Sequence, residues 1–321
     1  MLKAGFIAIV GRPNSGKSTL LNAVMDSEIS IVTPKAQTTR DQVVGILSQA
    51  DVGQIVFIDT PGIHKAREGG LNQYMVNQAI AALESPHVIW YLVDPSSALE
   101  HEQPVIDLIA RAVSGHSIPV FLLMNKIDFA ESKKIPASRL EGTEKDITQA
   151  LKDKNVDVRA AFKISGLTKA GLPDLLAQSW ALMPESPPYY PDQEQLSDRP
   201  TRFFVSEKIR EQLYRNLGEE IPYSCAVEIN KFDENPKLPR IEATIHVERE
   251  SQKGMVIGGK GSKIKEIGQA ARVEIEKFLG QKIFLGLKVD LLKNWSQNAD
   301  ALRKMGYDLP ATGKKGKGKR K

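Results

Sequence analysis

The stretch "GFIAIVGRPNSGKSTLLNAVM", residues 5–25, decides the fold. It begins with an apolar run typical of a buried strand, continues through Gly11–Ser18, and ends in a run with helical spacing. The middle part fits the pattern G-x-x-x-x-G-K-[ST], and a phosphate-binding loop requires this position between a strand and a helix. We therefore predict a nucleotide-binding loop, or P-loop, near the N-terminus.

The residue types of this loop suit an oxyanion. Gly11 and Gly16 allow successive backbone N–H groups to point at a phosphate, and the following helix adds its dipole. We expect Lys17 to reach the β- and γ-phosphates and the Ser18 hydroxyl to bind Mg²⁺. The predicted nucleotide-binding residues of the loop are Gly11, Arg12, Pro13, Asn14, Ser15, Gly16, Lys17, Ser18 and Thr19.

Two later motifs concern the base. "NKID", residues 125–128, follows the apolar strand "VFLLM", and Asp128 can accept hydrogen bonds from N1–H and the N2 amine of guanine, a pattern that adenine lacks. "SGLTKAG", residues 165–171, follows the strand "VRAAFKI" and is expected to give a backbone N–H to the guanine carbonyl. The predicted base-side residues are Asn125, Lys126, Asp128, Ser165, Gly166 and Leu167.

Two further segments concern the metal and the γ-phosphate. "DTPG" ends a strand, and its residues Asp59, Thr60, Pro61 and Gly62 are predicted to bind nucleotide, with Asp59 holding Mg²⁺ through water and the Gly62 N–H contacting the γ-phosphate. "TPKAQTTRD", residues 33–41, is expected to supply a threonine to Mg²⁺. Thr39 is our choice and Thr38 the alternative. The predicted metal ligands are Ser18, Thr39 and Asp59, and the predicted catalytic residues are Lys17, Thr39, Gly62 and Asn14.

The residue after Gly62 departs from a common pattern. Many GTPases place a glutamine there to orient the attacking water, but this chain has Ile63. Because isoleucine cannot position water, we expect hydrolysis to be slow or to be helped by another group. His64 could touch the water, although an exposed loop histidine is more commonly a bystander.

Length and pattern predict more than one domain. At 321 residues the chain exceeds the usual size of a single core. Up to residue 182, apolar runs recur between amphipathic stretches, which predicts an α/β domain with a mostly parallel sheet, helices on both faces, and a hairpin in residues 43–60. The proline-rich segment 183–200 is predicted to be a semi-rigid linker, residues 201–300 a smaller α+β domain, and residues 301–321 a basic Lys/Gly-rich tail, disordered from Thr312.

Charge separates the two parts. The net charge is +5, but residues 1–198 carry −5 and residues 199–321 carry +10. Six of the basic residues in the second part lie in residues 313–321. A basic half suggests a polyanionic partner such as RNA or an anionic lipid surface. Cys225 is the only cysteine, so no disulfide can form within the chain, which suits a reducing cytosol. The N-terminal apolar run is too short to span a bilayer.

A second glycine-rich loop, "MVIGGKGSKIKEIG", covers residues 255–268. A bare G-x-x-G is weak evidence, but here a strand, "IEATIHVERE", precedes it and isoleucines follow at helical spacing. The arrangement resembles the K homology (KH) domain, whose G-x-x-G loop clamps the backbone of unpaired nucleotides while bases lie in an apolar groove. The predicted RNA-binding residues are Ile257, Gly258, Gly259, Lys260, Gly261, Lys263, Ile264 and Lys265.

The five nucleotide motifs, in this order, resemble the translation-factor-related class of bacterial GTPases. Together with the KH pattern they resemble a family of bacterial ribosome-assembly GTPases over residues 1 to about 300. The resemblance implies GTP hydrolysis with Mg²⁺, binding near the 3′ end of 16S rRNA, and a role in assembly of the 30S subunit. It also implies a cytoplasmic protein with peripheral association to the inner membrane; we expect a monomer.

Two details of the motifs bear on that resemblance. Related GTPases with an asparagine at the position of Asn14 use it to bind K⁺ beside the phosphates, which implies a possible K⁺ requirement here. Gly166 replaces the alanine that the family usually carries in its last motif, which leaves the backbone contact available in a looser form.

We expect a switch in which the γ-phosphate and Mg²⁺ order the segments around Thr39 and Gly62 and so change the affinity for RNA. The alternative is an RNA-binding module or chaperone in which guanine nucleotide is only a structural ligand. A P-loop kinase is a weaker alternative because "NKID" would be superfluous in it.

Overall fold

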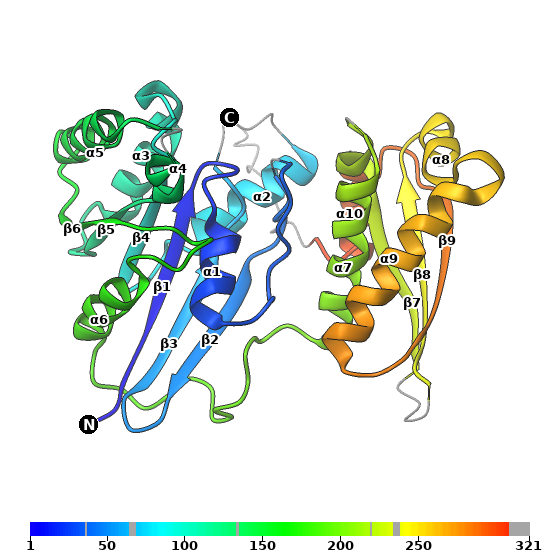
Figure 1. Ribbon diagram of the computed structural model, residues 1–321, viewed down its shortest axis with the longest axis horizontal. Helices are drawn as coiled ribbons and strands as arrows, with labels where there is room; N and C mark the ends of the chain where they lie inside the picture. The colour runs from blue at the N-terminus through cyan, green and yellow to red at the C-terminus, as the bar shows by residue number, and fades with distance from the viewer. Residues whose placement is uncertain (36, 64–68, 133–134, 219, 234–237, 308–321) are drawn as a thin grey trace, which may run out of the picture. The chain divides into compact units, whose positions relative to one another are not determined.

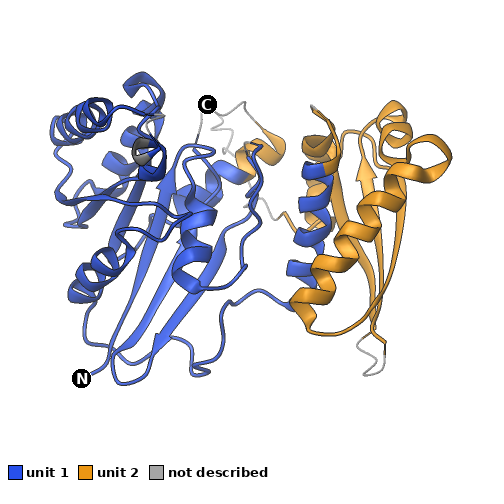
Figure 2. Ribbon diagram, in the orientation of Figure 1, with its two compact units in different colours: residues 1–66, 75–215 blue, residues 67–74, 216–321 orange. Residues whose placement is uncertain are grey.

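The computed structural model describes residues 1–35, 37–63, 69–132, 135–218, 220–233 and 238–307. The chain divides into two compact units (Figures 1 and 2). Unit 1 comprises residues 1–66 and 75–215, and unit 2 comprises residues 67–74 and 216–321. His64 and the tail beyond residue 307, including the segment predicted to be disordered, lie outside the described residues.

Unit 1 is built on a six-stranded sheet with the order β2-β3-β1-β4-β5-β6. β2 pairs antiparallel with β3, which confirms the predicted hairpin, and the other neighbouring strands are parallel. The strands are β1 (Lys3–Gly11), β2 (Val43–Gln49), β3 (Gly53–Asp59), β4 (Val88–Val93), β5 (Val120–Met124) and β6 (Val158–Lys163).

Helices cover both faces of this sheet, as predicted for a parallel arrangement. One face is covered by α1 (Lys17–Met25) and α6 (Leu172–Leu182), and the other by α2 (Gly70–Ala81), α3 (Leu99–Val113) and α5 (Ala137–Lys152). Unit 1 also contains α4 (Ile127–Glu131) and α7 (Thr201–Asn216), and α2 begins in unit 2. All six residues of β4 are buried, and successive side chains enter opposite cores: Trp90 packs with Phe57 on one face, and Tyr91 packs on the other. The sheet is therefore apolar on both faces and exposes the ends of its strands.

The proline-rich segment is attached to unit 1. The backbone N–H of Ala4 donates to the carbonyl of Pro184, and that of Ile46 donates to the carbonyl of Leu196. Side chains add further contacts, including a hydrogen bond from Ser197 Oγ to the Val44 carbonyl. The segment is therefore bonded to the start of β1 at one end and to β2, the edge strand of the sheet, at the other.

Unit 2 contains a three-stranded sheet with the order β7-β8-β9, in which β7 and β8 are antiparallel and β8 and β9 parallel. Its strands are β7 (Ala226–Asp233), β8 (Arg240–Val247) and β9 (Phe284–Leu291), and its helices are α8 (Glu250–Ile257), α9 (Ser262–Leu279) and α10 (Ala299–Lys304). The α+β prediction is confirmed.

β8 is buried on both of its faces: Thr244 and His246 are buried, as are the apolar residues that alternate with them. Each of the two polar side chains makes one hydrogen bond to β7: Thr244 Oγ1 donates to Asn230 Oδ1 (2.6 Å), and His246 Nε2 lies 2.7 Å from Glu228 Oε2. β8 is the central strand of the sheet, so both of its edges are paired and its polar side chains are bonded across the sheet.

Helix α7 belongs to unit 1 by its packing, so the two units divide after Arg215 and not in the proline-rich segment. The reason is a set of charged contacts from α7 to residues 28–38, including an ion pair between Lys208 and Glu28. Among the described residues, no helix is both long and apolar enough to cross a membrane.

Candidate active site and nucleic-acid interface

The P-loop connects β1 to α1 at the carboxyl edge of the sheet. Gly16 precedes α1 with a φ of 100°, and a Cβ atom there would come within 2.3 Å of Asn125 Nδ2. Only glycine satisfies both the backbone conformation and this close approach. The loop and the start of α1 line one pocket, together with residues 31–33, residues 37–39 and Gly62; from the loop and helix these are Pro13, Asn14, Gly16, Lys17, Ser18 and Thr19.

Lys17 enters this loop from the first turn of α1. Its Nζ donates to the carbonyls of Arg12 (2.8 Å) and Gly11 (3.2 Å), and its side chain is 5% exposed. Burial lowers the pKa of Lys17 to about 8, with Asp59 and Glu102 acting in the opposite direction. The ammonium is thus held by two backbone carbonyls and not by a direct carboxylate hydrogen bond among the described residues, so its charge is available to phosphate oxygens.

This lowered pKa makes a testable prediction about pH. Phosphate oxygens stabilise the ammonium, so they raise the pKa of Lys17 in the complex and binding takes up a proton above pH 8. Affinity for a GTP analogue should therefore be flat below pH 8 and fall above it by up to about tenfold per pH unit. Calorimetry in buffers of different ionisation enthalpy measures both effects. Lys17→Arg, whose side chain does not titrate, should remove the slope; a slope retained by that variant would contradict the assignment.

Three oxygen-bearing side chains meet beside Lys17. Ser18 Oγ donates to Asp59 Oδ2 (2.7 Å) and lies 2.9 Å from Thr39 Oγ1. These are the three residues predicted to hold Mg²⁺, and the structure brings Thr39 to Ser18. The alternative, Thr38, is turned to the Lys35 carbonyl (2.8 Å) and to Thr33 Oγ1 (2.7 Å).

The environment of Asp59 fits a hard cation. The carboxylate is fully buried at the end of β3, and burial raises its pKa, with the Lys17 ammonium opposing. Its Oδ1 has no hydrogen-bond partner within the described residues, an arrangement that is costly unless water or a metal satisfies it. Magnesium with its bound waters would supply both the charge and the donors. Ser30, which the sequence reasoning missed, also donates to Oδ2 (3.2 Å).

The base motif is tied directly to the P-loop. Asn125 Nδ2 donates to the Ser15 carbonyl (2.8 Å) and its Oδ1 accepts from the Gly166 N–H (3.0 Å). Lys126 Nζ donates to the Asn14 carbonyl (2.8 Å). Asp128 Oδ1 accepts from Ser165 Oγ (2.7 Å), which aligns the carboxylate. The structure thus brings residues 125–128 and 165–166 to the loop, while Leu167 is 74% exposed.

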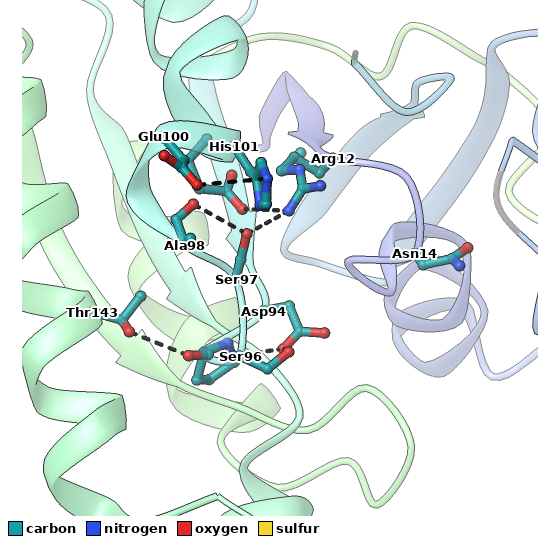
Figure 3. A network of polar contacts seen from close by, with 12 residues as sticks. Arg12, Asn14, Asp94, Ser96, Ser97, Ala98, Glu100, His101 and Thr143 are labelled. Atoms are coloured by element: carbon teal, nitrogen blue, oxygen red, sulfur yellow. Dashed lines mark hydrogen bonds and ion pairs between the residues drawn. The ribbon is translucent and has the colours of Figure 1, made fainter.

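The side chain of Arg12 takes part in the polar network shown in Figure 3. Its guanidinium donates to Ser97 Oγ and lies 3.8 Å from Glu102 Oε1, while Tyr91 OH donates to Glu102 Oε2 (2.8 Å). Burial raises the pKa of Glu102. Within the described chain, Arg12 is therefore placed to contribute its carbonyl to Lys17 and its side chain to the start of α3.

Asn14 and residues 60–63 make further contacts around the P-loop. Asn14 Nδ2 donates to the Pro34 carbonyl (3.2 Å), and Thr60 Oγ1 donates to the Ile9 carbonyl (2.9 Å). A Cβ on Gly62 would come within 2.6 Å of Pro13, so the glycine backbone is packed against the P-loop. Ile63 is buried in the apolar core on one face of the sheet, and its N–H donates to the Gly11 carbonyl (3.1 Å).

Unit 2 presents the second glycine-rich loop between α8 and α9. Gly258 has a φ of 72°, and a Cβ there would come within 2.6 Å of Lys263 Cβ, so this position requires glycine. Lys260 has a φ of 51° and is exposed, as is Gly259. Ile267, Ala271 and Ile275 are buried and anchor α9 along one face.

The lysines of this loop differ in their surroundings. Lys260 and Lys265 are exposed, whereas Lys263 Nζ lies 2.7 Å from Glu266 Oε2. An exposed pair of this kind is weak and can exchange for a phosphate. Ile257 and Ile264 are half-buried beside the loop. The loop therefore combines exposed residues with positive charge, the chemistry of a nucleic-acid backbone clamp.

Fold and site together define the class: a P-loop GTPase domain followed by a KH domain. Residues 6–126 match the family described as 50S ribosome-binding GTPase, and residues 220–296 match the KH domain. The chain is similar over nearly its whole length to GTPase Era from Geobacter metallireducens (43% identity, 95% of this chain and 98% of the relative) and from Carboxydothermus hydrogenoformans (40%, 95% and 98%). The chain belongs to the GTPase Era family.

Two solved structures resemble the whole chain. One is Era from Aquifex aeolicus bound to GDP and AlF₄⁻, and the other is Era in complex with MgGDPNP and nucleotides 1506–1542 of 16S ribosomal RNA. Each has a TM-score of 0.87 and 34% identity and covers 96% of this chain and 100% of that one.

Proposed function

We propose that this protein is a GTP-hydrolysing switch that binds the 3′ region of 16S rRNA through its KH domain and assists assembly of the 30S subunit. The observation that carries the proposal is the full-length similarity to Era in complex with MgGDPNP and a 16S rRNA fragment. The geometry described above supplies the residues. Cytoplasmic location, peripheral association with the inner membrane and a monomeric state belong to the same proposal and rest on the family.

The nucleotide is held at both of its ends. Lys17 and the P-loop N–H groups bind the phosphates, and the base is read by Asp128 while Gly166 supports Asn125. Ser18, Thr39 and Asp59 would hold Mg²⁺, which neutralises charge that develops on the phosphate oxygens. Arg12 accepts a hydrogen bond from Lys17 through its carbonyl, and its guanidinium lies beside Glu102 on α3. The loop is therefore fixed before the nucleotide binds.

Hydrolysis requires an oriented water molecule, and many GTPases use a glutamine directly after the D-x-x-G glycine for this purpose. Here that position is Ile63. Ile63 is buried and its backbone is bonded to Gly11. We propose that K⁺ bound near Asn14 supplies part of the missing stabilisation, so that phosphate release is faster in K⁺ than in Na⁺. Partner binding is the other source of acceleration.

The RNA part of the proposal is tested at Gly259 and Lys260. A Cβ on Gly259 meets nothing within 4 Å, so the double variant Gly259→Asp/Lys260→Asp should fold. The variant replaces the Lys260 cation and the exposed Gly259 with two carboxylates. These carboxylates repel phosphates. We expect affinity for a single-stranded RNA carrying the 3′ sequence of 16S rRNA to fall by roughly tenfold or more. Fluorescence anisotropy with labelled RNA measures it.

A matched control exists in unit 1. Gly142 and Lys145 are exposed on α5, and a Cβ on Gly142 also meets nothing within 4 Å. The variant Gly142→Asp/Lys145→Asp makes the same chemical change away from the loop and should bind RNA within about twofold of the unaltered protein. Equal affinity of both variants and the unaltered protein would remove the KH loop from the proposal. GTP-analogue binding should be unchanged in both.

A further inference from the structure

Helix α7 places charged side chains against the segment that carries Thr39. Arg210 Nη1 donates to the Thr38 carbonyl (2.6 Å), and Arg215 Nη2 donates to the Val32 carbonyl (3.3 Å). Tyr214 OH donates to the Gln37 carbonyl (3.4 Å). Lys208 forms an ion pair with Glu28 (2.8 Å) at the start of the same segment. Residues 28–38 are therefore bonded to α7 at several points along their length.

Arg210 is the most buried of these cations. Its side chain is 2% exposed, and a buried guanidinium requires both a counter-charge and acceptors for its N–H groups. Glu207 supplies the counter-charge by accepting from Nε (2.7 Å) and from Nη2, and the ring of Tyr214 lies under the guanidinium at 5.6 Å. The third group in contact is the Thr38 carbonyl. Arg210 is thus fixed on α7 before it contacts this carbonyl.

The carbonyl of Thr38 belongs to the peptide bond that leads into Thr39. Holding this carbonyl fixes the peptide plane, and with it the position of the Thr39 Cα from which the side chain extends. The Thr38 side chain is fixed on its other side by Lys35 and Thr33. In this arrangement Thr39 Oγ1 lies 2.9 Å from Ser18 Oγ, which in turn donates to Asp59 Oδ2 (2.7 Å).

We infer that Arg210 is a positioning residue for the Mg²⁺–triphosphate site: it holds the Thr38–Thr39 peptide so that the Thr39 hydroxyl reaches the metal. The inference rests on the proposed function, because it assumes that Thr39 binds Mg²⁺ when triphosphate is present. Its consequence is that a helix outside the nucleotide motifs controls one metal ligand. The helix ends at Asn216, where unit 2 resumes in the sequence.

The test compares Arg210→Ala, Arg210→Lys and, as a control, Arg202→Ala, an exposed arginine on the same helix. The Mg²⁺ concentration for half-maximal binding of a fluorescent GDPNP should rise by about tenfold or more in Arg210→Ala, because a buried charge-assisted hydrogen bond is lost. Arg210→Lys can donate to the carbonyl but not to both oxygens of Glu207, so it should recover part of the effect. GDP affinity should stay within about twofold, because GDP lacks the γ-phosphate that Thr39 serves.

Hydrogen exchange gives a readout that needs no nucleotide. In nucleotide-free Arg210→Ala, amides of residues 28–40 should exchange faster while those of β1 and β4 stay protected. If this variant does not fold, Glu207→Gln removes the counter-charge of Arg210 and is expected to raise the Mg²⁺ requirement in the same direction.

Three results would overturn the inference: an unchanged Mg²⁺ requirement, unchanged exchange in residues 28–40, or an equal loss of GDP and GDPNP affinity, which would mark a merely structural role. Failure of the proposed function looks different, since the unaltered protein itself would then not bind GDPNP.

Discussion

The variant Lys17→Ala should lose at least about 100-fold in phosphate release from GTP, the effect expected from removing one preorganised donor to the reacting phosphate. Lys17 is buried in the P-loop, and its ammonium is oriented by two backbone carbonyls. Alanine removes the charge and leaves those carbonyls facing the β- and γ-phosphates. Affinity for a GTP analogue should fall more than affinity for GDP, because Lys17 serves the γ-phosphate as well.

The measurement is steady-state phosphate release together with calorimetry of nucleotide binding. Lys154→Ala is a suitable control, because Lys154 is an exposed lysine of the same unit that lies outside the nucleotide motifs and pairs with Asp107 at the surface. Its activity should stay within about twofold of the unaltered protein. The result also separates two functions: if the unaltered protein releases no more phosphate than Lys17→Ala, guanine nucleotide is only a structural ligand and the RNA-chaperone alternative is favoured.

The variant Asp128→Asn should reverse the choice of base. The carboxylate of Asp128 accepts from two donors on guanine, whereas an asparagine amide offers one acceptor and one donor. Xanthine carries a carbonyl in place of the guanine amine and so matches asparagine. We expect GTP affinity to fall by at least about 1000-fold and xanthosine triphosphate to bind better than GTP, because a site built for a hydrogen bond strongly rejects a ligand that lacks it.

Nucleotide competition measures this reversal. Asparagine keeps an oxygen that can accept from Ser165 Oγ, so the local structure should survive. ATP serves as the control nucleotide and should bind weakly to both forms. Displacement of GTP by ATP with equal affinity in the unaltered protein would favour a kinase and contradict the assignment of Asp128.

The nucleotide motifs were predictable because short local rules determine them. A strand followed by glycines, lysine and serine forms a P-loop for reasons contained within residues 5–25, and the carboxyl ends of parallel strands bring Asp59 and Asn125 to the same edge of the sheet. Asp94 follows β4 at this edge, bonds Lys126 (2.7 Å), and could have been found by the same rule. Ser30 could not, because its contact with Asp59 depends on the path of a loop.

The packing of α7 was beyond local reasoning. Its sequence, "TRFFVSEKIREQLYRN", has charged residues that suggest a solvated face, yet Lys208 and Arg210 are buried. Their partners, Glu28 and the Thr38 carbonyl, lie about 170 to 180 residues earlier in the chain. A backbone carbonyl gives no signal in the sequence. For the same reason the direction of the Arg12 side chain could not be predicted, since its partners on and beside α3 come together only in the folded unit.

We expect the nucleotide state to control the affinity for RNA. The most direct test is the dissociation constant of the protein for a single-stranded RNA with the 3′ sequence of 16S rRNA, measured by anisotropy with saturating Mg²⁺–GDPNP and again with saturating GDP. Binding should be tighter with GDPNP, because only the triphosphate orders the segments around Thr39 and Gly62. Equal dissociation constants in the two states would contradict it.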